Sequence, residues 1–157
     1  MTPMGRVTMR LSELDLVLPT RVPPAPDHAV AVQSGSLLFL SGHGPLDEDR
    51  RPVYKGRVGA ELTEEDGYVA ARRCALNVLA TLEAELDDLD RVRRVIRLTG
   101  YVSSPPDFER HPWVINGASQ LFTDVFLDRG RHARTTMGVA GLPLGMPCAI
   151  DCVFEVD

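Results

Sequence analysis

The chain has 157 residues, of which 44% are hydrophobic and 25% charged, values that fit one globular domain. Its net charge of −5 at pH 7 gives no general attraction to phosphate backbones, so we expect no nucleic-acid partner. No apolar run reaches the length of a membrane span, and Glu13 and Asp15 interrupt the apolar stretch that a signal peptide needs. We therefore expect a cytoplasmic protein with no membrane partner.

The first 27 residues (1–27) read as an N-terminal extension of one domain that spans residues 28–157. Prolines at positions 23, 24 and 26 restrict the backbone and remove amide donors, which excludes a regular helix there. This composition favours an extended strap. We expect the strap to lie on the surface of the domain.

A hairpin is predicted where the domain begins. The segment "HAVAVQSGSLLFLSG", which starts at His28, contains two strand-like runs around a turn at residues 34–36. The second run, Leu37–Leu40, is apolar throughout, which predicts a strand covered on both faces. A loop follows it, with one short edge strand expected near residues 53–54.

Two helices are predicted from apolar residues that recur at helical spacing. Thr63 precedes three acidic residues, a typical helix start, and the first helix is placed over residues 64–86. Residues 91–104 are rich in β-branched side chains and predict a strand with a bulge at Gly100. A second helix follows, and its predicted apolar positions are Trp113, Ala118, Leu121, Phe122 and Val125.

Strands over residues 133–139 and 149–156 complete an order of elements that is typical of an α+β domain. We predict a mixed sheet with both helices on one face. The other face is left with apolar residues and no helix to cover it. Association with further copies of the chain is the simplest way to bury that face.

The sequence contains no pattern typical of a metal site. Its four histidines have no HxxxH or HxH spacing and no CxxC pair is present, so we expect no bound metal. The cysteines Cys74, Cys148 and Cys152 are predicted to be small core residues. In a strand the last two lie about 13 Å apart, which is too far for a disulfide between them.

Arg134 is the strongest candidate for a binding residue. A guanidinium group can hold a carboxylate through two parallel hydrogen bonds and stays charged at any working pH. Ser41 follows an apolar strand and precedes a glycine, so its hydroxyl could face a ligand. The patterns leave the alternative open that Arg134 only caps a strand and Ser41 only enters a turn.

Four segments together resemble the RidA/YjgF family. They are "GSLLFLSGHGPLD", "AARRCALNVLATLEAELDDLDRVRRVIRLTGYVSS", "DFERHPWVINGASQLFTDVF" and "HARTTMGVAGLPLG", and the similarity extends along nearly all of residues 28–157. Residues 1–27 resemble the N-terminal extension that one branch of this family carries. The resemblance implies a chorismate-mutase-like (YjgF-like) α+β fold assembled as a homotrimer. It further implies three clefts between subunits that hydrolyse 2-imino acids to 2-oxo acids and ammonia with no cofactor.

The resemblance also implies roles for individual residues. The carboxylate-binding arginine of the family falls on Arg134, its serine on Ser41 and its helix asparagine on Asn116. Thr136 falls at a position whose main chain faces the substrate. The active-site tyrosine of the family is replaced by His28, which could act as an acid or base near neutral pH.

A glutamate of the deaminases, which positions water on the last strand, is replaced by Ala149. Asp151 is predicted on the same strand face, but about 6.5–7 Å further along, too far to replace the glutamate. The arginine that binds the substrate carboxylate, Arg134, is therefore retained, while the residues that position and activate water differ from the family pattern.

Three functions remain open at this level. The first is a deaminase of the 2-iminobutanoate/2-iminopropanoate type, weak or altered because of Ala149, with Arg134, Ser41 and His28 as catalytic residues. The second is a non-catalytic trimeric protein that binds a small carboxylate ligand through Arg134, Thr136 and Asn116. The third is a ribonuclease, against which the acidic net charge argues.

Overall fold

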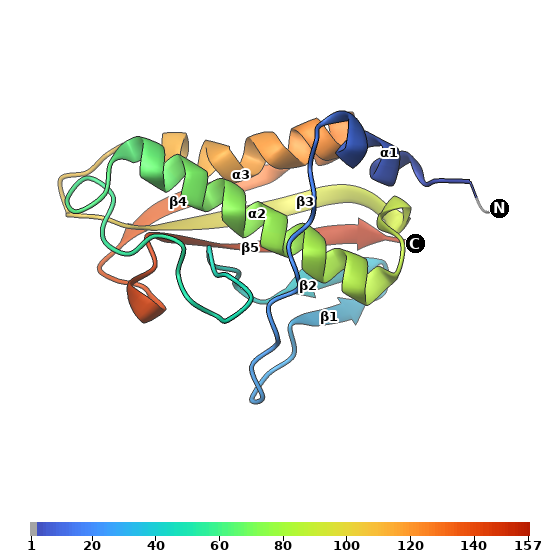
Figure 1. Ribbon diagram of the computed structural model, residues 1–157, viewed down its shortest axis with the longest axis horizontal. Coiled ribbons are helices and arrows are strands. Elements are labelled where there is room, and N and C mark those ends of the chain that lie inside the picture. Colours follow the sequence, from blue (N-terminus) through green and yellow to red (C-terminus); the bar gives the residue numbers. More distant parts are fainter. Residues whose placement is uncertain (1–2) are drawn as a thin grey trace.

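The computed structural model describes residues 3–157 and shows a five-stranded mixed sheet with two long helices packed on one face (Figure 1). The strand neighbours are antiparallel except for the parallel pair β3 and β4. These features confirm the predicted α+β class and the placement of both long helices. In order across the sheet, the strands are β1 (Ala31–Ser34), β2 (Leu37–Leu40), β5 (Cys148–Val156), β3 (Val92–Ser103) and β4 (Ala133–Val139).

Helix α2 (Glu64–Leu86) has the bounds predicted from sequence. The Thr63 side chain accepts from the Asp66 amide at 3.1 Å, and the Asp66 carboxylate accepts from the Thr63 amide at 3.0 Å. This capping box satisfies two amides that have no partner inside the helix. The helix ends where Asp87 adopts a left-handed conformation (φ 63°).

Helix α3 (His111–Phe126) crosses α2 at close range. A Cβ atom added at Gly117 would collide with the main-chain carbonyl oxygen of Tyr68 in α2. Because that oxygen belongs to the backbone, it cannot move aside as a flexible side chain could. The absence of a side chain at Gly117 therefore sets how closely the two helices approach.

Gly100 was predicted to form a bulge in β3, and this is wrong. It pairs in regular register with Thr136 of β4 and Ile150 of β5, and the register shifts of β3 lie instead between residues 92 and 97. A Cβ atom at Gly100 would lie 2.6 Å from the Ile115 side chain of α3. The glycine is required by helix-on-sheet packing and not by strand geometry.

Strand β5 alternates strictly between the two faces of the sheet. Cys148, Ile150, Cys152 and Phe154 are buried under the helices, while the residues between them are half-buried on the other face. Cys74 of α2 is also fully buried. The prediction that all three cysteines are core residues is therefore confirmed.

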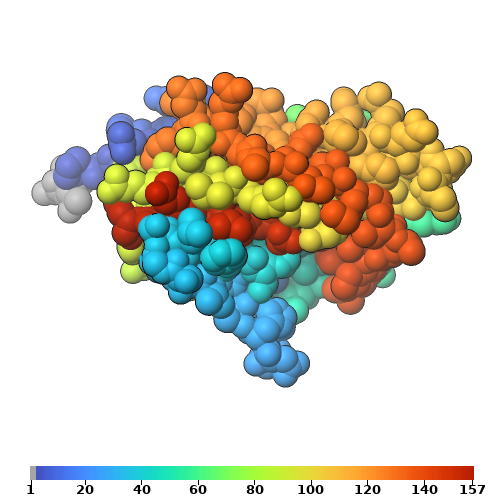
Figure 2. Space-filling view, turned by 180° about the vertical axis from the view of Figure 1, so that it is seen from behind, coloured from blue at the N-terminus to red at the C-terminus, as the bar shows by residue number. Residues whose placement is uncertain are grey.

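The sheet face opposite the helices is uncovered in the single chain and is seen directly in Figure 2. Val32, Phe39 and Met137 are 56%, 45% and 39% exposed. The expectation that β2 is covered on both faces is thus wrong for one chain, because both long helices lie on the same side. Residues 53–54 also form no strand, and the loop after β2 holds only isolated bridges, of which the nearest joins Leu46 and Pro52.

If copies associate through this face, Phe39→Glu is expected to leave the chain monomeric, because a buried carboxylate without a partner is strongly unfavourable. The measurement is molar mass by light scattering at micromolar concentration. Val69→Glu is the control, since Val69 is 48% exposed on α2 and should not change the mass. A wild-type protein that is itself monomeric would contradict the expectation.

The N-terminal segment packs against the domain at several points. Helix α1 (Arg6–Glu13) is held by Asp90, whose carboxylate accepts from the Arg6 and Val7 amides at 2.7 and 2.8 Å. Residues 14–27, called the strap below, then cross α2 toward β1 without regular structure (Figure 1). Arg21 of the strap forms an ion pair with Glu85 of α2 at 2.6 Å.

Candidate functional site

The residues predicted for the site form two separate groups within one chain. Arg134 and Thr136 lie on β4, beside Asn116 of α3. Ser41 follows the end of β2, near His28. Strands β5 and β3 separate β2 from β4, so the two strands are about 14 Å apart. A single chain does not bring all five residues into one cleft.

Arg134 is held by two neutral side chains of α3. Its Nη1 donates to Asn116 Oδ1 at 2.8 Å and to Ser119 Oγ at 3.1 Å. No ion pair links Arg134 to an acidic group of residues 3–157. Burial lowers the pKa of Arg134 from its usual value, but a guanidinium of this kind remains a cation near neutral pH. The Arg134 guanidinium is therefore held in place by neutral groups, and no acidic partner neutralises its charge.

Ser119 is itself oriented by His132, which precedes β4. His132 Nδ1 lies 2.7 Å from the Gly130 carbonyl oxygen, so this nitrogen must donate. In the neutral ring Nε2 then accepts the Ser119 hydroxyl at 2.9 Å, which leaves Ser119 Oγ free to accept from Arg134. Sequence reasoning missed both residues. The spacing of three between Asn116 and Ser119 was the available signal, because it places both on one helix face.

The second group borders a cavity of about 290 Å³ between the strap, the loop after β2 and α2. The Ser41 hydroxyl, one of its lining groups, donates to the Ala29 carbonyl oxygen at 2.7 Å. His28 is exposed and also lines the cavity. Most of the remaining wall is apolar and is formed by Val22, Pro23, Val30, Leu46, Leu144 and Met146.

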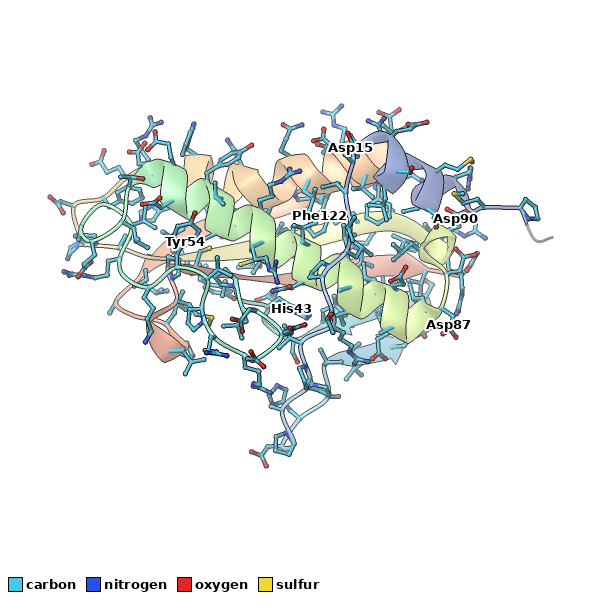
Figure 3. All side chains as sticks on the ribbon, viewed as in Figure 1. Asp15, His43, Tyr54, Asp87, Asp90 and Phe122 are labelled. Carbon is cyan, nitrogen blue, oxygen red and sulfur yellow. The ribbon has the colours of Figure 1, made fainter. Side chains whose placement is uncertain are left out.

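His43 is a buried histidine between the loop after β2 and the C-terminal half of α2 (Figure 3). Its Nδ1 donates to the Ser41 carbonyl oxygen at 2.7 Å, and its Nε2 accepts the Thr81 hydroxyl at 2.8 Å. Burial is the main cause that lowers the pKa of His43. The neutral ring therefore ties the main chain at Ser41 to α2.

Stability should fall in mild acid because burial lowers the pKa of both His43 and His132 below 6.5. As pH drops through 6.5, the unfolded state takes up these protons first, so the free energy of unfolding decreases. The loss is at most about 1.4 kcal/mol per pH unit for each histidine. Urea unfolding at pH 7.5, 6.5 and 5.5 measures it. His132→Gln should show a shallower decrease than wild type, and equal slopes would contradict this.

Ala149 and Asp151 lie on the uncovered face of β5. Ala149 is opposite Tyr101 of β3 in register, and the Tyr101 hydroxyl donates to Asp151 Oδ2 at 2.7 Å. That hydrogen bond is the main cause that raises the pKa of Tyr101. The carboxylate nearest to Ala149 along β5 is therefore already engaged by a phenol.

Two further observations concern residues 3–157 only. No group of three or more histidine, cysteine, aspartate or glutamate side chains is placed to hold a metal ion. None of the helices combines the length and the hydropathy that crossing a bilayer requires.

Comparisons with known proteins identify close relatives over almost the whole chain. The profile of a family described as "YjgF/chorismate_mutase-like, putative endoribonuclease" matches residues 10–156. Protein TCP17 of Trypanosoma cruzi is 42% identical over 154 residues, which is 98% of this chain and 96% of that protein.

Solved structures agree with this match. The protein Atu1372 of Agrobacterium tumefaciens, of unknown function, is 38% identical with a TM-score of 0.87, over 96% of this chain and 94% of that one. A "putative endoribonuclease" of Shewanella oneidensis MR-1 is 29% identical with a TM-score of 0.91, over 97% of this chain and 100% of that one.

A more distant structure, E. coli TdcF with bound serine, shares the fold at 21% identity and a TM-score of 0.60. The match covers 90% of this chain and 96% of that one.

Proposed function

Because this chain belongs to the YjgF/chorismate-mutase-like family, we propose that it hydrolyses small 2-imino acids to 2-oxo acids and ammonia. The observation that carries the proposal is the state of Arg134. Its guanidinium is held by Asn116 and Ser119 and has no acidic partner among residues 3–157. A cation positioned in this way is suited to a ligand carboxylate.

The complete site requires two copies of the chain. One half of the site consists of Arg134, Asn116 and Thr136, and the other half consists of Ser41 and His28. The strands that carry or precede these halves, β4 and β2, are about 14 Å apart across the sheet. The uncovered sheet face, with its exposed apolar side chains, supports association of copies. In a homotrimer with cyclic symmetry, each cleft would combine one half from each of two neighbours.

The reaction needs a held substrate, a water molecule and proton transfer. Arg134 binds the carboxylate and thereby fixes the neighbouring imine carbon in the cleft. The oxygen of water adds to that carbon and one of its protons passes to the nitrogen, which gives a carbinolamine. The hydroxyl proton then passes to the nitrogen as the C–N bond breaks, which releases ammonia and leaves the 2-oxo acid. His28 and the Ser41 hydroxyl are the groups in this proposal that carry protons.

A second candidate is a protein that binds a small carboxylate without turning it over. Position 149 carries an alanine, which cannot orient water. The Asp151 carboxylate is occupied by the Tyr101 hydroxyl. TdcF, whose structure contains serine, is a distant relative with a small carboxylate-bearing ligand. In this reading Arg134 binds its ligand and no reaction follows.

A competition assay separates these two functions. An amino-acid oxidase generates the imine, semicarbazide traps it, and the purified protein competes with the trap. A deaminase diverts imine from semicarbazide in proportion to the protein added. A protein that diverts none, yet binds 2-oxobutyrate by calorimetry, is a carboxylate-binding relative instead.

The family description also mentions endoribonuclease activity. The net charge of −5 opposes RNA binding, and residues 3–157 contain no metal-binding cluster. We therefore place this function third. RNA degradation that persists in the Arg134→Ala variant, after removal of contaminating nuclease, would restore it.

A further inference from the structure

The cavity beside Ser41 has a positively charged group in its wall and no negatively charged one. Of the described residues that line it, Arg50 is the only arginine or lysine, and none is an aspartate or glutamate. The guanidinium group of an arginine stays charged at any working pH. The volume of about 290 Å³ is at the lower end for sites that hold small organic ligands. A small anion that enters this cavity therefore meets a cation and no opposing carboxylate in the wall.

Arg50 is held beside the cavity by its main chain and by its side chain. Its amide donates to the Asp47 carbonyl oxygen at 3.0 Å and closes a tight turn, in which Arg50 has a left-handed φ of 63°. Its Nη1 donates at 2.9 Å to the carbonyl oxygen of Pro23, a strap residue that also lines the cavity. A guanidinium group offers several N–H donors, so most of them remain for a ligand.

The charge of Arg50 has no acidic partner within residues 3–157. The acidic side chains next to it in the loop are engaged elsewhere. Asp49 pairs with Arg51 at 2.6 Å, and Asp47 Oδ1 accepts from the Asp49 and Arg51 amides, each at 2.9 Å. Arg50 is exposed, so water can solvate its charge when no ligand is bound. Its guanidinium is thus available to a carboxylate.

We propose that this cavity binds the side chain of the substrate, and that this side chain is an aliphatic stem that ends in a carboxylate. The substrate is then a 2-imino dicarboxylic acid, with Arg134 of one copy on the first carboxylate and Arg50 of its neighbour on the second. The inference rests on the proposed function, because Ser41 and His28, its proton carriers, line this same cavity. The apolar part of the wall packs against the methylene groups of the stem, and the guanidinium suits the terminal carboxylate.

Calorimetry of stable 2-oxo acid products tests the second carboxylate. 2-Oxoglutarate carries this group, and 5-methyl-2-oxohexanoate has the same shape with an isopropyl group in its place. The wild-type protein is expected to bind 2-oxoglutarate about tenfold more tightly, because only that acid forms charge-assisted hydrogen bonds with Arg50. Raising the salt concentration from about 0.05 M to about 0.5 M should reduce the preference, since exposed charges are screened. Equal affinity for the two acids, or tighter binding of the isopropyl analogue, would overturn the proposal.

Three variants test the role of Arg50. Arg50→Gln removes the charge, while the new amide can still donate to the Pro23 carbonyl oxygen. It should weaken 2-oxoglutarate binding about tenfold and leave binding of the isopropyl analogue unchanged. Arg51→Gln is the matched control, since it makes the same change of charge at a neighbouring residue that does not line the cavity. Arg50→Lys keeps the charge and should retain most of the preference. Equal losses in the two glutamine variants, or none in Arg50→Gln, would overturn the role of Arg50.

Failure of this subsite and failure of the proposed function give different results. If wild type shows no preference while Arg134→Ala abolishes binding of both acids, the carboxylate anchor stands and the dicarboxylate is wrong. If wild type prefers 2-oxoglutarate through Arg50, yet diverts neither the imine of glutamate nor a smaller one from semicarbazide, the subsite stands and hydrolysis is wrong.

Discussion

Arg134→Ala is expected to lower kcat/KM for 2-imino acids by about a hundredfold or more. The substitution removes the charge-assisted hydrogen bonds that bind the substrate carboxylate, and no other group of α3 or β4 replaces them. Because Arg134 forms no ion pair within residues 3–157, the melting temperature should change little. The assay is the competition with semicarbazide described above, with calorimetry of 2-oxobutyrate as a second readout.

Arg131→Ala provides the matched control. Arg131 is exposed, lies three residues before Arg134, and its side chain makes no hydrogen bond or ion pair that the structure records. Its loss changes net charge in the same way without touching the group formed by Arg134, Asn116 and Ser119. Equal losses in both variants would show a general charge effect and would contradict the assignment of Arg134.

Mixing two inactive variants tests whether the site is shared between copies. Arg134→Ala damages one half-site and Ser41→Ala the other. If subunits exchange after mild denaturation and refolding of an equal mixture, about a quarter of the clefts regain both halves. Activity should then reappear although neither variant is active alone. No recovery in a mixture shown to contain both subunits would mean that the two halves do not meet between neighbours.

Gly117→Ala is expected to destabilise the fold by about 3 kcal/mol, the upper end for overpacking a core. Intrinsic helix propensity alone favours alanine by about 1 kcal/mol, so the expected sign depends on tertiary contact. The added methyl would collide with the Tyr68 carbonyl oxygen, and the helices can relieve the collision only by separating. Thermal unfolding measures the effect, and the melting temperature should fall by about 10 °C.

Gly141→Ala is the control for the same chemical change. No atom lies within 4 Å of a Cβ added there, and Gly141 is not among the residues with positive φ. Its melting temperature should stay close to that of wild type. A Gly117→Ala protein as stable as Gly141→Ala would show that α2 and α3 can separate without cost.

Several features were predictable because they depend on nearby residues. Helix α2 was placed from Glu64 to Leu86 because the apolar repeat and the Thr63–Asp66 capping box are both local signals. The hairpin of β1 and β2 was predicted from its turn. The structure makes that turn one residue shorter, since Ser34 pairs with Leu37.

The errors concern contacts between segments distant in the chain. Gly100 was interpreted as a strand irregularity, although its neighbour in space is Ile115 of α3. The apolar run of β2 was expected to be covered on both faces of the strand. Only one face is covered in the chain, because both long helices pack on the same side of the sheet. Phe39 is 45% exposed in the chain, because its side of β2 lies on the face that neither long helix covers.

The sequence by itself determined the class of fold, the long helices and the candidates Arg134, Ser41, Asn116, Thr136 and His28, because each rests on a local pattern or a linear motif. Only the tertiary structure decided which of them meet, since the sheet order separates Ser41 from Arg134 by two strands. It also decided that Ser119 and His132 orient Arg134, across 13 and 15 positions of sequence. Hydrogen bonds and cavity walls of this kind depend on the packing of distant segments, which no periodicity in the chain encodes.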